Sequence, residues 1–248
     1  MVVLMYHDVY AHEKNESGFQ NETALGYKIN SSEFERQINK ICANNSPDTY
    51  ALSFDDGGTS FSELILPILD KYHVKGHFFI ATNYIGTVGF LTEDQIREIR
   101  SHGHFIGAHT ASHCSNLSQM KDEDIKREWE ISINRLENVL GEKITEVSIP
   151  CGNYDKRTLD VLSCIENISK VYTSDPTTKE KYVKNLCVIG RFGIKENMSS
   201  DVACKIVSSR SFRSKIVIRK TFLNILKLVF GKYYYKVRTI IQKKQNIV

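Results

Sequence analysis

The stretch Leu52-Ser53-Phe54-Asp55-Asp56-Gly57-Gly58 joins an apolar run to two adjacent carboxylates and two glycines. This is the profile of a buried strand that opens into a site. Neighbouring side chains at a strand end point in different directions, so one carboxylate can bind a cation while the other faces the reacting atoms. Gly57 and Gly58 keep the turn free of Cβ atoms and let a ligand approach the backbone. Taken alone, the stretch is equally compatible with a strand followed by a solvated turn.

A second polar cluster, His109-Thr110-Ala111-Ser112-His113, follows another apolar run, Phe105 to Ala108. Its histidines stand at i and i+4, a spacing that one helical turn would place on one face. One Asp and two His form a mixed oxygen and nitrogen ligand set suited to Zn²⁺ or another first-row divalent ion, with positions left for water and substrate. Such a histidine pair is more often ordinary surface or core histidine. Its coincidence with a strand-end Asp pair favours a metal site.

These two clusters resemble the motifs of a known family. Residues 53–57 (Ser-Phe-Asp-Asp-Gly) and 109–113 (His-Thr-Ala-Ser-His) are similar to the first two motifs of the polysaccharide deacetylases, also called NodB-homology proteins or family-4 carbohydrate esterases. The resemblance extends over roughly residues 1 to 195. It implies that Asp55 is the catalytic base. It also implies a metal site whose ligands are Asp56, His109 and His113.

Strand and helix patterns alternate along the chain. Strands are predicted at 2–6, 50–54, 76–80, 105–108, 144–149, 170–174 and 186–191, and helices from 31 onward, at 61–72, after Thr92, at 121–140 and at 155–166. The alternation predicts an α/β fold with a parallel sheet, either a closed barrel or an open doubly wound sheet. The resemblance implies a distorted (β/α) barrel of about seven strands with its motifs at one mouth. The polar segment 10–29 is predicted to be a lid.

The third motif of this chain departs from the family pattern. The family usually has Pro-Tyr-Gly, preceded two residues earlier by Arg, whereas this chain has Pro150-Cys151-Gly152 preceded by Ser148. The resemblance implies that the backbone N–H of Cys151 helps to bind the oxyanion, a role that does not depend on its side chain. Arg191, at a predicted strand end, is the candidate to replace the missing charge beside Asp55.

The general-acid motif of the family, Leu-x-His, is not found near the C-terminal end of the domain. Leu4-Met5-Tyr6-His7 is similar to it, as in family members of the poly-N-acetylglucosamine deacetylase type, where this motif comes first. The first and last strands of a closed barrel are neighbours, so moving this motif from the last strand to the first keeps its histidine at the same place in the site. The resemblance therefore implies that His7 is the general acid and that Asp175 orients it. Cys151, Arg191 and Asp175 complete the predicted substrate-binding side of the site.

Length and composition are those of a globular protein. A chain of 248 residues with 41% hydrophobic and 25% charged residues is long enough for one large α/β domain. Its six cysteines show no C-x-x-C spacing, so we expect reduced cysteines in a cytoplasmic protein. The N-terminus has no basic region followed by a long apolar one, and no secretion signal is predicted.

Charge is distributed unevenly between the two parts of the chain. Residues 205–248 hold twelve Lys or Arg and no Asp or Glu, which leaves 21 of the 33 basic residues against all 29 acidic ones before them. Apolar residues in this part recur at helical spacing: Phe222, Ile225, Leu226 and Val229, then Tyr233, Val237, Ile240 and Ile241. We predict a barrel over 1–204 and a tail of two basic amphipathic helices over 205–248 that lies on an anionic membrane surface. Packing of these helices on the barrel is the alternative, and nucleic acid is not expected.

These features together predict a metal-dependent hydrolase that removes an acetyl group from an N-acetylated sugar of a glycan or of a lipid-linked glycan intermediate. We expect it to be cytoplasmic and peripheral at the inner face of the membrane, with Zn²⁺ as the metal. Two alternatives remain. One is a non-catalytic glycan-binding protein on the same fold, motivated by the missing Arg and Tyr, and the other is a hydrolase of another small amide or acetyl ester.

Overall fold

The computed structural model describes residues 1–230 of the chain, which divides into two compact units, Met1–Ser208 and Ser209–Val248. The last helix of the first unit is α7 (Ser200–Ser208), which runs through the boundary predicted after Cys204. No helix among the described residues has the length and apolar character needed to cross a membrane.

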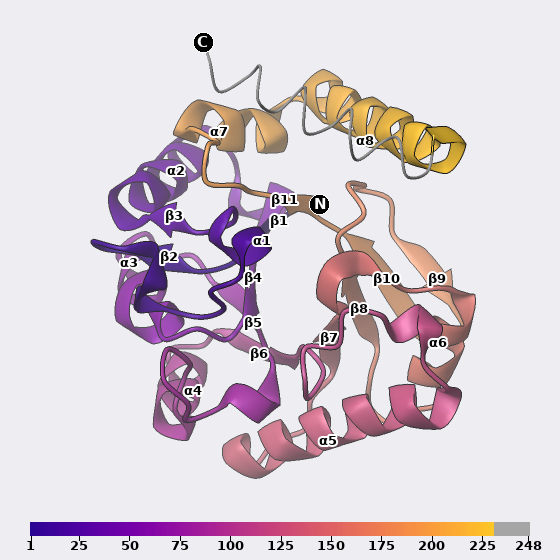
Figure 1. The fold of residues 1–248 in the computed structure, drawn as a ribbon. Helices are drawn as coiled ribbons and strands as arrows, with labels where there is room; N and C mark the ends of the chain where they lie inside the picture. The colour runs from indigo at the N-terminus through magenta and orange to yellow at the C-terminus, as the bar shows by residue number, and fades with distance from the viewer. Residues whose placement is uncertain (231–248) are drawn as a thin grey trace. The chain divides into compact units, whose positions relative to one another are not determined.

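The first unit is built on a curled sheet of nine strands (Figure 1). Eight strands run parallel to their neighbours: β1 (Val2–Tyr6), β4 (Tyr50–Asp56), β5 (Gly76–Ile80), β6 (Phe105–Ala108), β7 (Glu146–Ser148), β8 (Lys170–Thr173), β10 (Leu186–Gly190) and β11 (Phe192–Gly193). The ninth, β9 (Lys181–Val183), pairs antiparallel with β10 at the edge. The strand order is β11-β1-β4-β5-β6-β7-β8-β10-β9.

A single residue, Arg191, separates β10 from β11. Strand β10 pairs with β8 at one end of the sheet, whereas β11 pairs with β1 at the other end. The last stretch of the unit therefore joins both ends of the sheet and gives it the form of a distorted barrel. The predicted α/β fold is confirmed. The strand expected over 186–191 ends at Gly190, and β9 and β11, which were not predicted, bring the sheet to nine strands instead of about seven.

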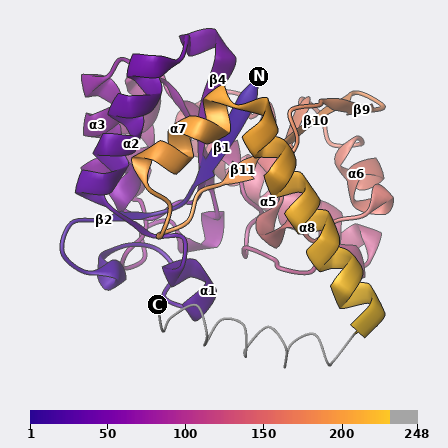
Figure 2. The ribbon, with the colours of Figure 1, turned by 90° about the horizontal axis from the view of Figure 1, so that it is seen from above.

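Helices lie along the outside of this sheet, as Figures 1 and 2 show for α2, α3 and α5. The helices of this layer are α2 (Ser31–Asn44), α3 (Leu66–Lys71), α4 (Glu93–Ser101), α5 (Asp122–Leu140), α6 (Lys156–Leu162) and α7, which packs against α2. Single turns of helix occupy Pro47–Thr49, Thr82–Tyr84, Leu117–Gln119 and Pro150–Gly152.

Local sequence explains where these helices begin and end. Helix α4 starts at a capping box in which Thr92 and Gln95 satisfy each other's backbone N–H groups. Helix α5 buries an apolar stripe and ends at Gly141, whose φ of 70° suits glycine. The helix predicted over 61–72 is divided: a π-helical turn, Phe61–Ile65, precedes α3, and Pro67 lies in the first turn of α3, where its missing N–H costs little.

The segment predicted as a lid is an ordered loop whose two ends lie side by side. Strand β2 (Val9–Tyr10) pairs in parallel with β3 (Ile29–Asn30). Between them lie a single helical turn, Lys14–Glu16, and the short helix α1 (Glu22–Leu25). We call residues 11–28 the N-terminal loop.

The described part of the second unit is helix α8 (Arg210–Phe230). It contains the first of the two amphipathic patterns predicted for the tail. The second predicted helix, around residues 233–241, lies outside the described residues.

Candidate active site

The carboxyl ends of neighbouring strands carry the predicted site residues. Asp55 and Asp56 end β4, His109 follows β6 directly, and His7 follows β1. The strands are parallel and in register, with Tyr6 opposite Phe54 and Asp56 opposite Ile80. Parallel strands place their carboxyl ends at one end of the sheet, so these four side chains meet there.

Asp56, His109 and His113 form a cluster with the geometry of a metal site. One ligand atom from each residue lies within 4.8 Å of the other two. The Asp56 Oδ1 atom is 3.5 Å from His109 Nε2 and 3.1 Å from His113 Nε2.

Hydrogen bonding at the cluster fits a bound cation. His109 Nδ1 lies 2.8 Å from the carbonyl oxygen of Ser148, which can only accept a hydrogen bond, so Nδ1 carries the proton. The lone pair of His109 Nε2 then faces Asp56. Asp56 Oδ1 is buried and accepts no hydrogen bond from the residues that the structure describes. Two electron-rich atoms that face each other in this way are suited to hold a divalent ion between them.

The interpretation of the histidine pair as one helical turn is wrong. Residues 109–113 form a loop in which Thr110 has a φ of 60° and His113 a φ of 57°. These two left-handed residues turn the chain so that both imidazoles reach Asp56. Glu128 of α5, which sequence reasoning missed, holds the loop by accepting hydrogen bonds from the backbone N–H groups of Ala111 and Ser112.

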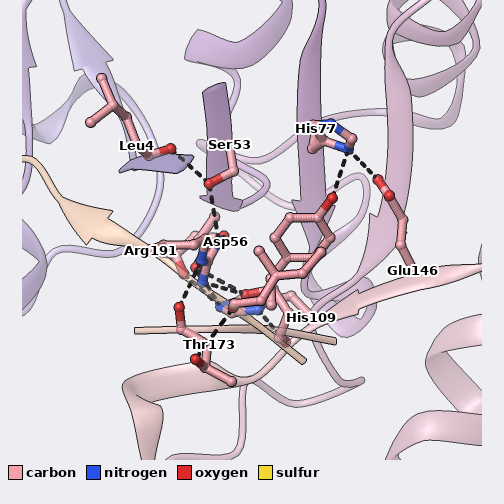
Figure 3. A network of polar contacts seen from close by, with 12 residues as sticks. Leu4, Ser53, Asp56, His77, His109, Glu146, Thr173 and Arg191 are labelled. Carbon is pink, nitrogen blue, oxygen red and sulfur yellow. Dashed lines mark hydrogen bonds and ion pairs between the residues drawn. The ribbon is translucent and has the colours of Figure 1, made fainter. Parts of the chain in front are cut away.

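A buried ion pair accompanies the metal cluster. Arg191 donates two parallel hydrogen bonds to Asp55, of 2.6 Å to Oδ1 and 2.7 Å to Oδ2, and its side chain has no exposed area. Figure 3 shows Arg191 beside Ser53 and Thr173, to which it also donates. Burial alone would raise the pKa of Asp55, but the Arg191 guanidinium reverses the direction and lowers it. Asp55 is therefore ionised and able to accept a proton.

Ser148 explains how an arginine from the last strand can reach Asp55. Ser148 Oγ accepts a hydrogen bond of 2.7 Å from Arg191 and donates one of 3.1 Å to Asp55. The short side chain at 148, where the family usually has Arg, leaves space that the Arg191 guanidinium occupies. The cue in the sequence was Ser148 in place of the family's Arg, together with Arg191 at a predicted strand end.

His7 stands at the edge of the same cluster. Its ring centroid is 4.5 Å from that of Tyr27, and its Nδ1 is buried without a hydrogen-bond partner in the described chain. Burial lowers the pKa of His7, although Asp56 and Asp55 act in the opposite direction. Asp175 accepts a 2.7 Å hydrogen bond from the Tyr154 hydroxyl. The role of Asp175 in orienting His7 stays a prediction.

Cys151 lies in the turn after β7 with a φ of 56°, a conformation that is unfavourable for a residue with a Cβ atom. Burial raises the pKa of its thiol, and Asp56 adds to the shift. The oxyanion role of its backbone N–H stays a prediction.

The fold and the site together define the class of protein. It has a curled parallel sheet with an Asp-His-His set and a second Asp, bound by an arginine, at the strand ends. A family model described as polysaccharide deacetylase matches residues 43–166, half of the chain. The chain belongs to the polysaccharide deacetylase family.

Individual relatives agree with this assignment. YxkH of Bacillus subtilis (strain 168), whose name refers to the same family, is 32% identical over 108 residues, which are 44% of this chain and 38% of that protein. A chitin deacetylase of Colletotrichum lindemuthianum is 35% identical over 84 residues, 30% of this chain and 34% of that protein. The chain thus spans less than two fifths of the length of these relatives.

Solved structures share the fold over a longer range. The deacetylase PplD of Streptococcus pyogenes, in complex with acetate, superposes with a TM-score of 0.69 at 23% identity, over 84% of this chain and 98% of that chain. A polysaccharide deacetylase of Bacillus cereus has the same TM-score at 17% identity, over 84% and 68%. At these identities the similarity shows the fold, and the permuted position of the His7 motif stays a prediction.

Proposed function

We propose that this protein is a metal-dependent hydrolase that removes the acetyl group from an N-acetylated sugar of a glycan or of a lipid-linked glycan intermediate. One observation carries the proposal. The Asp56, His109 and His113 ligand atoms lie within 4.8 Å of one another. The ionised Asp55 stands at the adjacent position on the same strand end, so a proton acceptor and a cation-binding set are next to each other.

The residues of the chain divide the work of amide hydrolysis. Asp55 accepts the proton of the attacking water, and Arg191 holds its carboxylate in one orientation. The backbone N–H of Cys151 donates to the oxyanion. His7 protonates the departing amine, which is a poor leaving group without a proton.

Asp56, His109 and His113 would hold the ion, for which we propose Zn²⁺ because two imidazoles and one carboxylate suit it. When bound, the ion polarises the acetyl carbonyl and lowers the pKa of a water molecule. The hydrogen bond from His109 Nδ1 to Ser148 sets the ring so that Nε2 is the coordinating atom.

The test combines metal analysis with acetate release from N-acetylglucosamine oligomers. Asp55→Asn should keep the metal while acetate release falls by roughly 10²–10⁴-fold, the contribution of a general base. Asp48→Asn, which changes an exposed carboxylate outside the site, is the matched control and should leave both quantities unchanged.

Alanine variants at Asp56, His109 and His113 should each lose metal. Full metal stoichiometry in all three would contradict the ligand assignment. Bound metal in the wild type without acetate release from any sugar would instead favour the glycan-binding protein or a hydrolase of another small amide or ester.

We propose further that the tail binds an anionic lipid surface and holds the enzyme at the cytoplasmic face of a membrane. Exposed apolar residues on α8 recur at i, i+4 and i+7: Ile218 is 68% exposed, Phe222 59% and Ile225 53%. The helix carries basic residues and no acidic ones. An exposed apolar stripe on a basic helix supports interfacial binding.

A further inference from the structure

A buried lysine holds the two halves of the N-terminal loop to each other. Lys28 is 1% exposed, and its Nζ donates to the carbonyl oxygens of Lys14, at 2.8 Å, and Ser17. A buried ammonium requires such acceptors, so both halves of the loop are held to it. The parallel pairing of β2 with β3 fixes the loop ends as well. The loop is thus a rigid wall rather than a free lid.

Asp8 attaches the loop to the turn after the Asp55-Asp56 pair. Its carboxylate accepts hydrogen bonds from Ser17 Oγ at 2.6 Å and Ser60 Oγ at 2.9 Å. A Cβ atom at Gly58 would stand 1.9 Å from Asp8 Oδ1 and 2.4 Å from Ser17 Oγ. The space at Gly58, which the sequence suggested for a ligand, is therefore filled by the Asp8 and Ser17 side chains.

Phe19 extends this attachment to the metal cluster. Its ring centroid lies 4.7 Å from His113, 4.8 Å from Tyr84 and 5.0 Å from Phe90. The ring packs edge-on against Tyr84 and Phe90, an arrangement that stabilises aromatic pairs. One half of the loop is therefore anchored beside a candidate metal ligand.

Tyr27, in the other half of the loop, lies against the proposed general acid. Its ring is 4.5 Å from that of His7 and is tilted 37° to it. Lys195 Nζ lies 5.5 Å from the same ring. The side chain is half-buried, and its hydroxyl has no hydrogen-bond partner within the described residues. Burial raises the pKa of the Tyr27 hydroxyl.

We propose that Tyr27 forms the aromatic wall of a sugar subsite next to His7. This inference rests on the proposed function. The amine that His7 protonates belongs to the sugar that loses its acetyl group, so this sugar must lie beside His7. A pyranose ring has an apolar C–H face and a rim of hydroxyls, and a tyrosine offers an apolar face with a free hydroxyl. Tyr27 therefore selects sugar substrates over other acetyl compounds.

The experiment compares a sugar substrate with a small ester that has no sugar. Full-length wild type, Tyr27→Ala, Tyr27→Phe and the control Tyr182→Ala, which removes a 71% exposed tyrosine from edge strand β9, are assayed on N-acetylglucosamine pentamer and on 4-nitrophenyl acetate. Binding of the glucosamine pentamer, the product class, is measured by calorimetry on metal-free protein.

Tyr27→Ala should weaken pentamer binding and raise KM for the acetylated pentamer by about tenfold, which corresponds to about 1.4 kcal/mol, within the range that a packed aromatic face contributes. Tyr27→Phe should recover most of this affinity, since it keeps the ring. Turnover of 4-nitrophenyl acetate should fall much less than turnover of the pentamer in Tyr27→Ala, because the nitrophenolate leaves without protonation and the ester has no sugar ring to pack on the wall.

Two results would overturn the inference. If Tyr27→Ala loses ester and sugar turnover equally, the residue is structural. If it deacetylates and binds the pentamer as the wild type does, there is no subsite at Tyr27. Wild-type protein that neither binds nor deacetylates the pentamer would refute the proposed function, and the subsite with it, so the two failures are distinguishable.

Discussion

Arg191→Met tests whether the arginine of the last strand organises the site. The change keeps an apolar stem but removes the guanidinium from Asp55, which is 3% exposed. Asp55 would then be a buried carboxylate without a counter-charge. Breaking a buried ion pair on one side costs about 3–5 kcal/mol, so we expect a loss of stability in that range. The lost donors to Asp55 would also raise its pKa and weaken it as a proton acceptor.

The assay is urea unfolding of metal-free protein at neutral pH, because metal binding to the folded state would add its own stabilisation. Arg36→Met is the matched control. Arg36 is exposed and forms a 2.7 Å surface pair with Glu33, three residues earlier on α2, so its loss should cost only about 0.5 kcal/mol.

A second substitution tests the exchange of positions between Arg191 and Ser148. Ser148→Arg alone should destabilise the protein by about 1–3 kcal/mol, because the space at position 148 is already filled. When Ser148→Arg is combined with Arg191→Met, the introduced guanidinium can take the place of the missing one, and we expect at least about 2 kcal/mol of favourable coupling. A cost below about 1 kcal/mol for Arg191→Met, or a double variant no more stable than the two changes added, would refute the reasoning.

Three further predictions concern other parts of the molecule. His7→Ala should lower acetate release by roughly 10²–10⁴-fold while metal content is kept, and loss of metal would make His7 a ligand instead. Burial raises the pKa of Asp8 from 3.8 to about 6, so the folded chain holds this proton more tightly than the unfolded chain does. Relative to Asp8→Asn, the wild type should therefore lose up to about 3 kcal/mol of unfolding free energy as the pH rises from about 4 to about 7. Urea unfolding at a series of pH values measures this, and the same pH dependence of the unfolding free energy in both proteins would contradict it. Full-length protein should sediment with anionic but not neutral liposomes, and Phe222→Ser should weaken this binding whereas Val88→Ser, at a fully exposed position of the first unit, should not.

The sequence alone was sufficient to predict seven of the nine strands of the sheet, all but β9 and β11, and the polar residues at strand ends. Both are local properties: an apolar run of strand length and the residues directly after it are read from a short window. Asp55 and Asp56 at the end of β4, and His109 after β6, were located in this way. The family resemblance added roles for them, and the family and the fold are confirmed.

Only the tertiary structure decided which distant groups meet at those strand ends. Arg191 and Asp55 are 136 positions apart, and their contact depends on the passage from β10 to β11 that joins the two ends of the sheet. The loop conformation that brings His113 to Asp56 depends on two left-handed residues and on Glu128 of a separate helix. The N-terminal loop became a wall because a lysine and an aspartate are buried with their partners. Periodicity in a sequence encodes which face of an element is buried, whereas the partner of a buried charge is set by the three-dimensional order of the strands.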